Sequence, residues 1–558
     1  MRLPIAFSIG TLVWCASKPE FEVRILADQM VGLRDRVKLA TDIYLPVKDA
    51  PSPVLLYRTP YNKDGQRNAG NWFAARGYAV VAQDVRGRFK SQGDFYPFVN
   101  EGKDGYDTIE WAAGQHWSNG KVGTIGASYL AWDQYHAAMY KPPHLVAMYA
   151  DVGGNNFYDE FGYPGGAPNL GWTVWMLGSA MSSGITPVDE LRAVQKDINA
   201  WFAQPPSERV KIFERFPAHK KLFEDFYSHP RFDDYWKQKG FFTQGGWKQV
   251  KDVPIFFVSG WYDYFVEGLI ENFTGLARIQ KTPKRMWLGP WPHSVGRAEC
   301  GQANFGSSAA FDMREVALDW FDFWMRSDPL EVLGQDRVRY FRMGGGSAER
   351  DASGRVAHGG SWQNSTFWPP RGLKWWKYYL QGEGGLSAYR PEAKAPSTYE
   401  YDPKNPAPSI GGRYTMVPTI AACAQDQSKL RGRPDVLTFE TEPLPEAVGV
   451  TGRVTAKLWV SSTAASADFT AKITDVYPDG FALILGDGIR RVAIESGKST
   501  RIEVDLGTIS NLFAKGHRIR LDVSSSNYPR AEPNANAGSQ SIFHDPLRPS
   551  LVELPIQK

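Results

Sequence analysis

The segment from Lys121 to Met139 constrains the fold of this chain more than any other. It reads KVGTIGASYLAWDQYHAAM, in which a short apolar run ends at Gly126, Ser128 follows, and a helix-compatible stretch comes next. A strand, a tight turn and a helix in this order lift the hydroxyl of the turn residue above a sheet. The residue two before the serine must be small, because the strand and the helix converge there, and Gly126 meets this condition. The pattern therefore predicts a nucleophile elbow with Ser128 as the nucleophile.

The elbow pattern is incomplete. Its simplest form has glycine two residues after the serine, where this chain has Leu130, followed by Ala131. A Gly-x-Ser triplet alone is weak evidence, because many such serines only form turns. The strand and helix around Ser128 are what favour a catalytic function.

Two later loops carry the partners that a serine nucleophile needs. A strand-like run at 253–259 leads into Asp263, and another at 286–288 leads into His293. A serine needs a base, and the base needs an acid that fixes its tautomer. In α/β-hydrolases the order along the chain is serine, acid, histidine, each after a strand. Alone, Asp263 could cap a helix and His293 could be a solvated loop residue; together they predict a triad with Ser128.

The chain divides into regions with different patterns of apolar and polar residues. Short apolar runs separated by helix-length stretches occupy 18–154 and 248–336, which predicts an α/β domain with a parallel sheet. Between them, 155–247 is rich in aromatic residues, Lys and Glu and is expected to form a helical cap over the strand ends. Regularly spaced β-like runs fill 337–558, as in a jelly-roll β-sandwich. The expected strands of the parallel sheet are 54–57, 79–83, 122–125, 145–150, 253–259 and 286–288.

The first 17 residues resemble a secretory signal peptide. One arginine precedes an apolar stretch from Leu3 to Trp14, and small residues follow. This predicts a periplasmic or secreted protein; the alternative is an apolar leader packed on the fold of a cytoplasmic protein. No later run is long enough to span a bilayer.

The net charge and the cysteine content narrow the range of possible binding partners and metal sites. The net charge is +4 over 558 residues, and there is no block of Lys and Arg. The sequence therefore lacks the basic patch that is typical of nucleic-acid-binding proteins. Three cysteines without a CxxC pair exclude a disulfide scaffold and a thiolate zinc site. Whether Cys300 and Cys423 pair is left open. Single histidines such as His116, His136 and His517 lack metal-ligand spacing, so no metal and no cofactor is expected.

Several further motifs together are specific to one family. They are RTPYNK at 58–63, QDVRGR at 83–88, SQGDF at 91–95, Trp111 with WSNG at 117–120, GASY at 126–129, YPGGA at 163–167, GWYD at 260–263 and GPWPH at 289–293. DFTAKITDVYPDG at 468–480 and GHRIRLDVSSSNYP at 516–529 add to them. The chain resembles the cocaine esterase and X-prolyl dipeptidyl-peptidase family (CocE/NonD-like), which includes α-amino-acid ester hydrolases and glutaryl acylases.

The resemblance implies an α/β-hydrolase domain, a helical cap and a C-terminal jelly roll. It also implies an oxyanion hole formed by the Tyr61 hydroxyl and the Tyr129 backbone N–H. One departure is Ala131, where the family usually has glycine and where a methyl group could crowd the elbow. Another is Tyr264 after Asp263, where the amino-acid ester hydrolases carry acidic residues nearby, and this favours an uncharged, apolar acyl group.

The expected substrate pocket is aromatic. Phe265 matches a lining position of the family, and Trp172 and Trp175 in the cap could grip an aromatic or cyclic group, although cap aromatics are commonly core residues. The predicted function is hydrolysis of small acyl esters or amides through an acyl-enzyme. Removal of X-Pro dipeptides is the alternative, and Asp159 or Glu160 in the pocket would favour it. A secreted binding protein on a degenerate hydrolase body is the non-enzyme alternative, supported only by Ala131. The sequence leaves the oligomeric state open, a homo-oligomer included.

Overall fold

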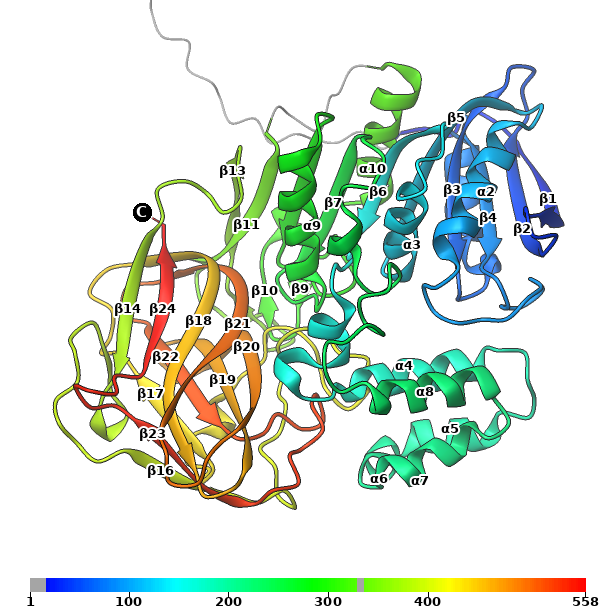
Figure 1. Ribbon diagram of the computed structural model, residues 1–558. Helices are drawn as coiled ribbons and strands as arrows, with labels where there is room; N and C mark the ends of the chain where they lie inside the picture. Colours follow the sequence, from blue (N-terminus) through cyan, green and yellow to red (C-terminus); the bar gives the residue numbers. More distant parts are fainter. Residues whose placement is uncertain (1–16, 329–335, 558) are drawn as a thin grey trace, which may run out of the picture.

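The centre of the molecule is a mostly parallel sheet in the order β1-β2-β4-β3-β5-β6-β7-β8-β11. Figure 1 shows this computed structural model, which describes residues 17–328 and 336–557. The strands are β1 (Val23–Gly32), β2 (Lys38–Pro46), β3 (Ser52–Thr59), β4 (Ala79–Asp84), β5 (Ser118–Ala127), β6 (Leu145–Asp151), β7 (Ile255–Gly260), β8 (Lys284–Gly289) and β11 (Val338–Gly344). The expected leader lies almost wholly outside the described residues.

The middle strands are buried on both faces. Every residue of β3, β4 and β7 is buried, because helices cover the sheet on either side, as is usual for parallel strands. The covering helices are α1 (Arg67–Ala74), α2 (Glu101–Ala113), α3 (Tyr129–Ala138), α9 (Val266–Ile279) and α10 (Met313–Phe321). The six expected strands of the sheet are confirmed, most of them one to several residues longer than predicted. Helix α10 ends at Phe321, and a π-helical turn, Asp322–Arg326, follows it directly.

Helices interrupt the sheet between β6 and β7. They are α4 (Leu170–Met181), α5 (Asp189–Lys196), α6 (Ile198–Phe202), α7 (Pro206–Arg209) and α8 (Pro217–Ser228). Figure 1 shows them gathered below the sheet, beside the ends of its strands. Their aromatic residues pack in one cluster with residues from one face of the sheet, so this cap and the α/β region share a core.

The C-terminal region is β-rich. One four-stranded antiparallel sheet has the order β17 (Val436–Glu440), β22 (Arg518–Ser524), β19 (Ser466–Val476) and β20 (Ala482–Ala493). Strands β14 (Lys374–Leu380), β24 (Leu551–Ile556), β18 (Val448–Ser462), β21 (Thr500–Phe513), β23 (Gly538–Phe543) and β16 (Ser397–Tyr401) pair with one another in a second set. A β-rich region was expected here; its assignment as a jelly roll stays a prediction.

The α/β and β-rich regions are joined more closely than the sequence indicates. Strand β11, at the start of the expected β-sandwich, instead extends the parallel sheet by pairing with β8. A disulfide joins Cys300 to Cys423, with the two Cα atoms 5.3 Å apart. The Tyr262 hydroxyl, in the loop after β7, donates to the Ile484 carbonyl at 3.0 Å. The β-rich region therefore braces the loop that carries Asp263.

Candidate active site

Ser128 stands in a strained turn between β5 and α3. Its backbone has φ 63° and ψ −122°, a conformation that non-glycine residues rarely adopt and that costs about 1–3 kcal/mol. The turn is tight, since a Cβ on Gly126 would lie 2.4 Å from the Cβ of Leu130. Gly126 therefore has to be a glycine, as the elbow pattern predicted.

The methyl group of Ala131, which departs from the family pattern, is accommodated by another glycine. Ala131 is fully buried, and a Cβ on Gly153 would lie 2.7 Å from its methyl carbon. Because Gly153 has no side chain, the extra methyl fits between α3 and the loop after β6. The crowding expected from the sequence does not arise.

The predicted acid and base are in contact. His293 Nδ1 donates to Asp263 Oδ1 at 2.8 Å, and the second carboxylate oxygen of Asp263 accepts from the Ser259 hydroxyl at 2.8 Å. Asp263 is completely buried, whereas the imidazole side chain is 18% exposed. A buried carboxylate on Nδ1 fixes the tautomer that leaves Nε2 free to accept a proton.

The two predicted oxyanion donors lie beside the nucleophile. Tyr61 follows β3, and its hydroxyl lies near Ser128 and accepts from Trp175 Nε1 at 2.9 Å. Burial raises the pKa of Tyr61 to about 12, so the phenol keeps its proton at neutral pH. Tyr129 is the first residue of α3, where a backbone N–H has no acceptor within the helix.

Tyr264 is a site residue that sequence reasoning missed. Its ring stacks on the imidazole of His293, with ring centres 4.8 Å apart, and its hydroxyl lies near Ser128. One phenol is therefore close to both the base and the nucleophile. The available signal was its position directly after Asp263, but the sequence argument used Tyr264 only as evidence that acidic residues are absent.

The residues predicted to form the substrate pocket belong to one aromatic cluster. Trp172 and Trp175 stack in the cap, with ring centres 4.7 Å apart. The ring centre of Phe161 lies 5.8 Å from that of Trp172 and 5.7 Å from that of Phe265. The ring centre of Phe265 lies 5.9 Å from that of His293. A continuous series of rings thus runs from the cap to the base.

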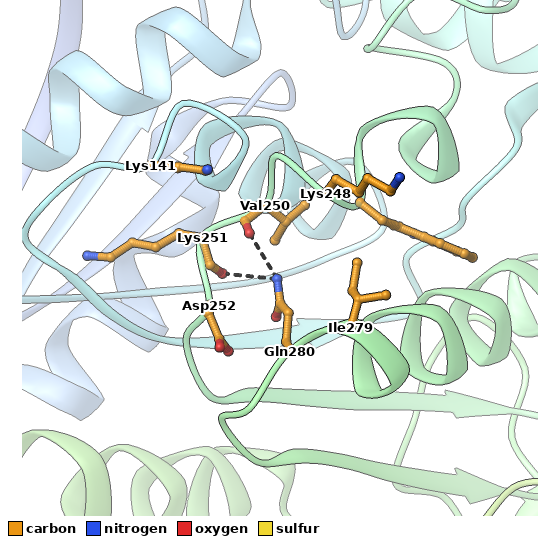
Figure 2. Close-up of a pocket in the computed structure, with 8 residues that line it drawn as sticks. Lys141, Lys248, Val250, Lys251, Asp252, Ile279 and Gln280 are labelled. Carbon is orange, nitrogen blue, oxygen red and sulfur yellow. Dashed lines mark hydrogen bonds between the residues drawn. The ribbon is translucent and has the colours of Figure 1, made fainter.

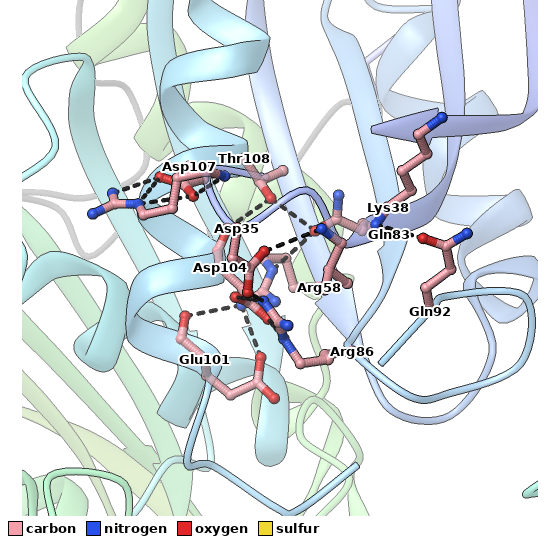
Figure 3. A network of polar contacts seen from close by, with 12 residues as sticks. Asp35, Lys38, Arg58, Gln83, Arg86, Gln92, Glu101, Asp104, Asp107 and Thr108 are labelled. Carbon is pink, nitrogen blue, oxygen red and sulfur yellow. Dashed lines mark hydrogen bonds and ion pairs between the residues drawn. The ribbon is translucent and has the colours of Figure 1, made fainter. Parts of the chain in front are cut away.

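A buried ion pair lies behind the elbow. The Tyr129 hydroxyl donates to Glu101 Oε1 at 2.8 Å, and Arg58 Nη1 lies 2.8 Å from Glu101 Oε2. Figure 3 shows Arg58 and Glu101 within a larger polar network that continues through Gln83 to Thr108. Burial raises the pKa of Glu101, and the charge of Arg58 opposes this rise. These residues anchor the side chain of Tyr129, and no motif had singled out Glu101.

A cavity of about 610 Å³ borders the base. Its lining comes from three regions and includes Asp159 and Glu160 before α4, Tyr264 of the α/β region, and Arg413 and Tyr414 of the β-rich region. Tyr264 and Tyr414 both stack on His293, which places the cavity directly beside the imidazole. Phe265, Trp172 and Trp175 do not line it. A volume of this size suits a small-molecule ligand.

A second hollow lies away from this site. It has a volume of about 350 Å³, and Figure 2 shows its lysines, Lys141, Lys248 and Lys251, with Gln280, which donates to the Val250 carbonyl at 2.9 Å. Its lining lies at the C-terminal ends of α3 and α9, at the opposite ends of the strands from Ser128.

In the described chain, no group of three His, Cys, Asp or Glu side chains could hold a metal. No helix of residues 17–328 or 336–557 is long and apolar enough to cross a membrane.

Two family models match this chain. Residues 35–295 match the X-Pro dipeptidyl-peptidase (S15) family, and residues 332–549 match the X-Pro dipeptidyl-peptidase C-terminal non-catalytic domain. The cocaine esterase of Rhodococcus sp. (strain MB1 Bresler) is 33% identical over 590 aligned positions, which cover 96% of this chain and 99% of the esterase.

Solved structures show the same fold. An aminopeptidase from a marine sediment Thaumarchaeota archaeon superposes with a TM-score of 0.82 at 23% identity, covering 99% of both chains. An α-amino-acid ester hydrolase superposes with a TM-score of 0.82 at 23% identity, covering all of both chains. The chain is an enzyme and not a binding protein on a degenerate fold: it belongs to the cocaine esterase and X-Pro dipeptidyl-peptidase family of serine hydrolases.

Proposed function

We propose that this enzyme hydrolyses small acyl esters through a Ser128–His293–Asp263 triad and an acyl-enzyme. The observation that carries the proposal is the 2.8 Å contact between His293 Nδ1 and buried Asp263, beside a serine held at φ 63°. A buried carboxylate, a fixed imidazole and a strained serine are the three parts that acyl transfer needs.

In the proposed mechanism, His293 Nε2 takes the Ser128 proton as the serine oxygen bonds to the carbonyl carbon. The negative charge on the carbonyl oxygen is met by the Tyr61 hydroxyl and the Tyr129 N–H. His293 then gives its proton to the departing alkoxide, and the C–O bond to the leaving group breaks. In the second half, His293 takes a proton from water as the water oxygen bonds to the acyl carbon. The C–O bond to Ser128 then breaks, and His293 returns the proton to the serine oxygen, which releases the acid.

The aromatic cluster supports an apolar acyl group. Phe265 is 3% exposed and lies against His293, and Trp172 and Trp175 are similarly buried. Phe265, Trp172 and Trp175 are therefore proposed to bind the acyl group when the substrate enters. The name of the Rhodococcus relative, an esterase, favours an ester over an amide.

An X-Pro dipeptidyl-peptidase activity is the second candidate, because Asp159 and Glu160 do line the cavity beside His293. A peptide amine would need an ionised carboxylate there. Glu160, however, already accepts from the backbone N–H groups of Asn155 and Asn156 at 2.8 and 2.6 Å, and burial raises its pKa well above the usual range. Burial also raises the pKa of Asp159. Both effects disfavour an ammonium site.

A substrate panel with an active-site probe tests the proposal. Purified enzyme is assayed on p-nitrophenyl esters of increasing acyl size and on Ala-Pro and Gly-Pro anilides, and it is labelled with a fluorophosphonate. We expect ester turnover to dominate and labelling to disappear in Ser128→Ala. Turnover confined to the anilides would select the dipeptidyl-peptidase, and undiminished labelling of Ser128→Ala would refute the triad.

We also propose that the enzyme works in an oxidising compartment, the periplasm or the exterior. Support comes from the apolar leader and from the Cys300–Cys423 disulfide, since structural disulfides are rare in reducing cytosol. N-terminal sequencing of the protein recovered from its native cell, with thiol titration, checks this. An intact leader and two free thiols would contradict it.

A further inference from the structure

Trp175 reaches from the cap to the proposed oxyanion hole. It lies on α4 and donates its indole N–H to the hydroxyl oxygen of Tyr61 at 2.9 Å, across 114 residues of sequence. Trp175 is 7% exposed and Tyr61 is 45% exposed, so the bond is shielded from water on the side of the indole. An indole nitrogen can only donate, and the Tyr61 oxygen is therefore the acceptor.

This bond decides where the Tyr61 proton points. A phenol has one hydrogen, and one side of its oxygen is occupied by the Trp175 N–H. The hydroxyl side chain of Ser128 is another polar neighbour of that oxygen. The hydroxyl hydrogen of Tyr61 is therefore free to point toward the Ser128 side. The carbonyl oxygen of a bound substrate would become an oxyanion on that side. A bond accepted by the same oxygen also polarises the O–H group and makes it a better donor.

We infer that Trp175 is a positioning residue of the active site, which acts through Tyr61 by orienting the phenol toward the oxyanion. The inference rests on the proposed function and deepens it. It gives the cap a part in catalysis besides covering the acyl group.

Packing is the competing explanation, and the neighbouring tryptophan separates the two. Trp172 stacks on Trp175 with ring centres 4.7 Å apart and is 2% exposed, so it shares the same apolar surroundings. Among the described residues, Trp172 makes no hydrogen bond to Tyr61. The indole that donates to the Tyr61 hydroxyl is that of Trp175. Trp172→Phe therefore removes a comparable packed surface and leaves the Tyr61 hydroxyl as it is.

The test is a double-mutant cycle on a p-nitrophenyl ester, with Tyr61→Phe, Trp175→Phe and their double variant; a second cycle pairs Tyr61→Phe with Trp172→Phe as the control. We expect Tyr61→Phe to lower kcat about 100-fold, as loss of one oxyanion donor does. Trp175→Phe should lower kcat about tenfold, and a change in KM without this loss would report only the proposed contact of the ring with the acyl group. In the Tyr61→Phe background it should change kcat by less than about twofold, because its target is gone.

A binding measurement adds a readout that packing would not move in the same way. A phenylboronic acid forms a tetrahedral adduct with a catalytic serine, so its affinity should fall in Trp175→Phe by about the same factor as kcat. Trp172→Phe also alters the proposed acyl site, but it should change kcat by the same factor with and without the Tyr61 hydroxyl, because the indole that donates to this hydroxyl is that of Trp175. If Trp175→Phe folds poorly, β-(3-benzothienyl)alanine at position 175 keeps the ring shape and replaces the N–H with sulfur, and the same losses are expected.

The outcomes separate the two levels of the argument. An equal loss of kcat from Trp175→Phe with and without the Tyr61 hydroxyl, or no loss at all, would overturn the inference and leave the triad standing. A Tyr61→Phe variant with parental kcat would overturn the oxyanion assignment itself, and the inference with it.

Discussion

Residues 17–328 and 336–557 contain two buried His–Asp pairs with nearly the same geometry. In the α/β region His293 Nδ1 lies 2.8 Å from Asp263, and in the β-rich region His517 Nδ1 lies 2.7 Å from Asp475. Both carboxylates are fully buried, and the imidazoles are 18% and 11% exposed. By residue type, distance and burial the pairs are equivalent.

Their surroundings are different. Beside His293 is Tyr264, whose hydroxyl lies near Ser128 at the strained elbow. Asp475 instead accepts from Asn511 at 3.1 Å, and Asn511 in turn meets the buried His358 at 2.9 Å. The second pair is thus closed within a polar network. A His–Asp pair becomes catalytic only where a nucleophile faces it.

The largest expected effect comes from removing that nucleophile. Ser128→Ala should lower kcat by about 10⁵-fold, since base and acid have nothing left to activate. Steady-state kinetics on a p-nitrophenyl ester measure this, with circular dichroism as the folding control. A folded variant that keeps more than a hundredth of the parental kcat would place the nucleophile elsewhere.

Asp263→Asn and Asp475→Asn form a matched test of the two pairs. Asp263→Asn should lower kcat about 10³-fold, because the amide no longer holds the Nδ1–H tautomer of His293. The measurement is kcat on the same ester at neutral pH. Equal kcat in parent and variant would remove Asp263 from the mechanism.

Asp475→Asn should leave kcat unchanged and lower the free energy of unfolding by about 2 kcal/mol. The physical reason is the loss of charge-assisted hydrogen bonds to His517 and Asn511 in a buried network. Urea denaturation gives the stability. A fall in kcat without a fall in stability would mean that this pair also takes part in the reaction.

Glu101→Gln should lower kcat about tenfold, which corresponds to about 1.4 kcal/mol. The amide keeps the shape of Glu101, but it leaves Arg58 without a counter-ion and weakens the acceptor of the Tyr129 hydroxyl. The side chain that anchors the first residue of α3 would then be less well fixed. Kinetics and thermal unfolding are measured together, and a drop in melting temperature at parental kcat would limit the network to stability.

The smallest expected effect is a pH dependence of stability in the β-rich region. Burial lowers the pKa of Lys472 to about 8, below its usual value near 10.5. Between these two values the folded lysine is neutral while the unfolded lysine is protonated, so stability from this group rises with pH. Lys472→Met should remove this rise, about 1 kcal/mol between pH 8 and 9. Urea denaturation of parent and variant at both pH values compares them, and identical slopes would contradict the assignment.

Local patterns determined the strands and the elbow. An apolar run of four to seven residues is buried in a parallel sheet almost wherever it occurs, and the runs before Ser128, Asp263 and His293 became β5, β7 and β8. The need for Gly126 could also be predicted, since strand and helix meet within a few residues of each other. These features depend on neighbours in sequence.

Tertiary structure decided what depends on distant residues. Nothing near His517 in the sequence announces Asp475 as its partner, and nothing near Tyr61 announces Trp175, which is 114 residues away. The same holds for β11, which was expected in the β-sandwich and instead extends the parallel sheet beside β8. Side-chain type and spacing give the chemistry that each group can perform. Which groups meet is fixed by packing between elements, because hydrogen bonds and ring contacts act over a few ångströms in space, whatever the separation along the chain.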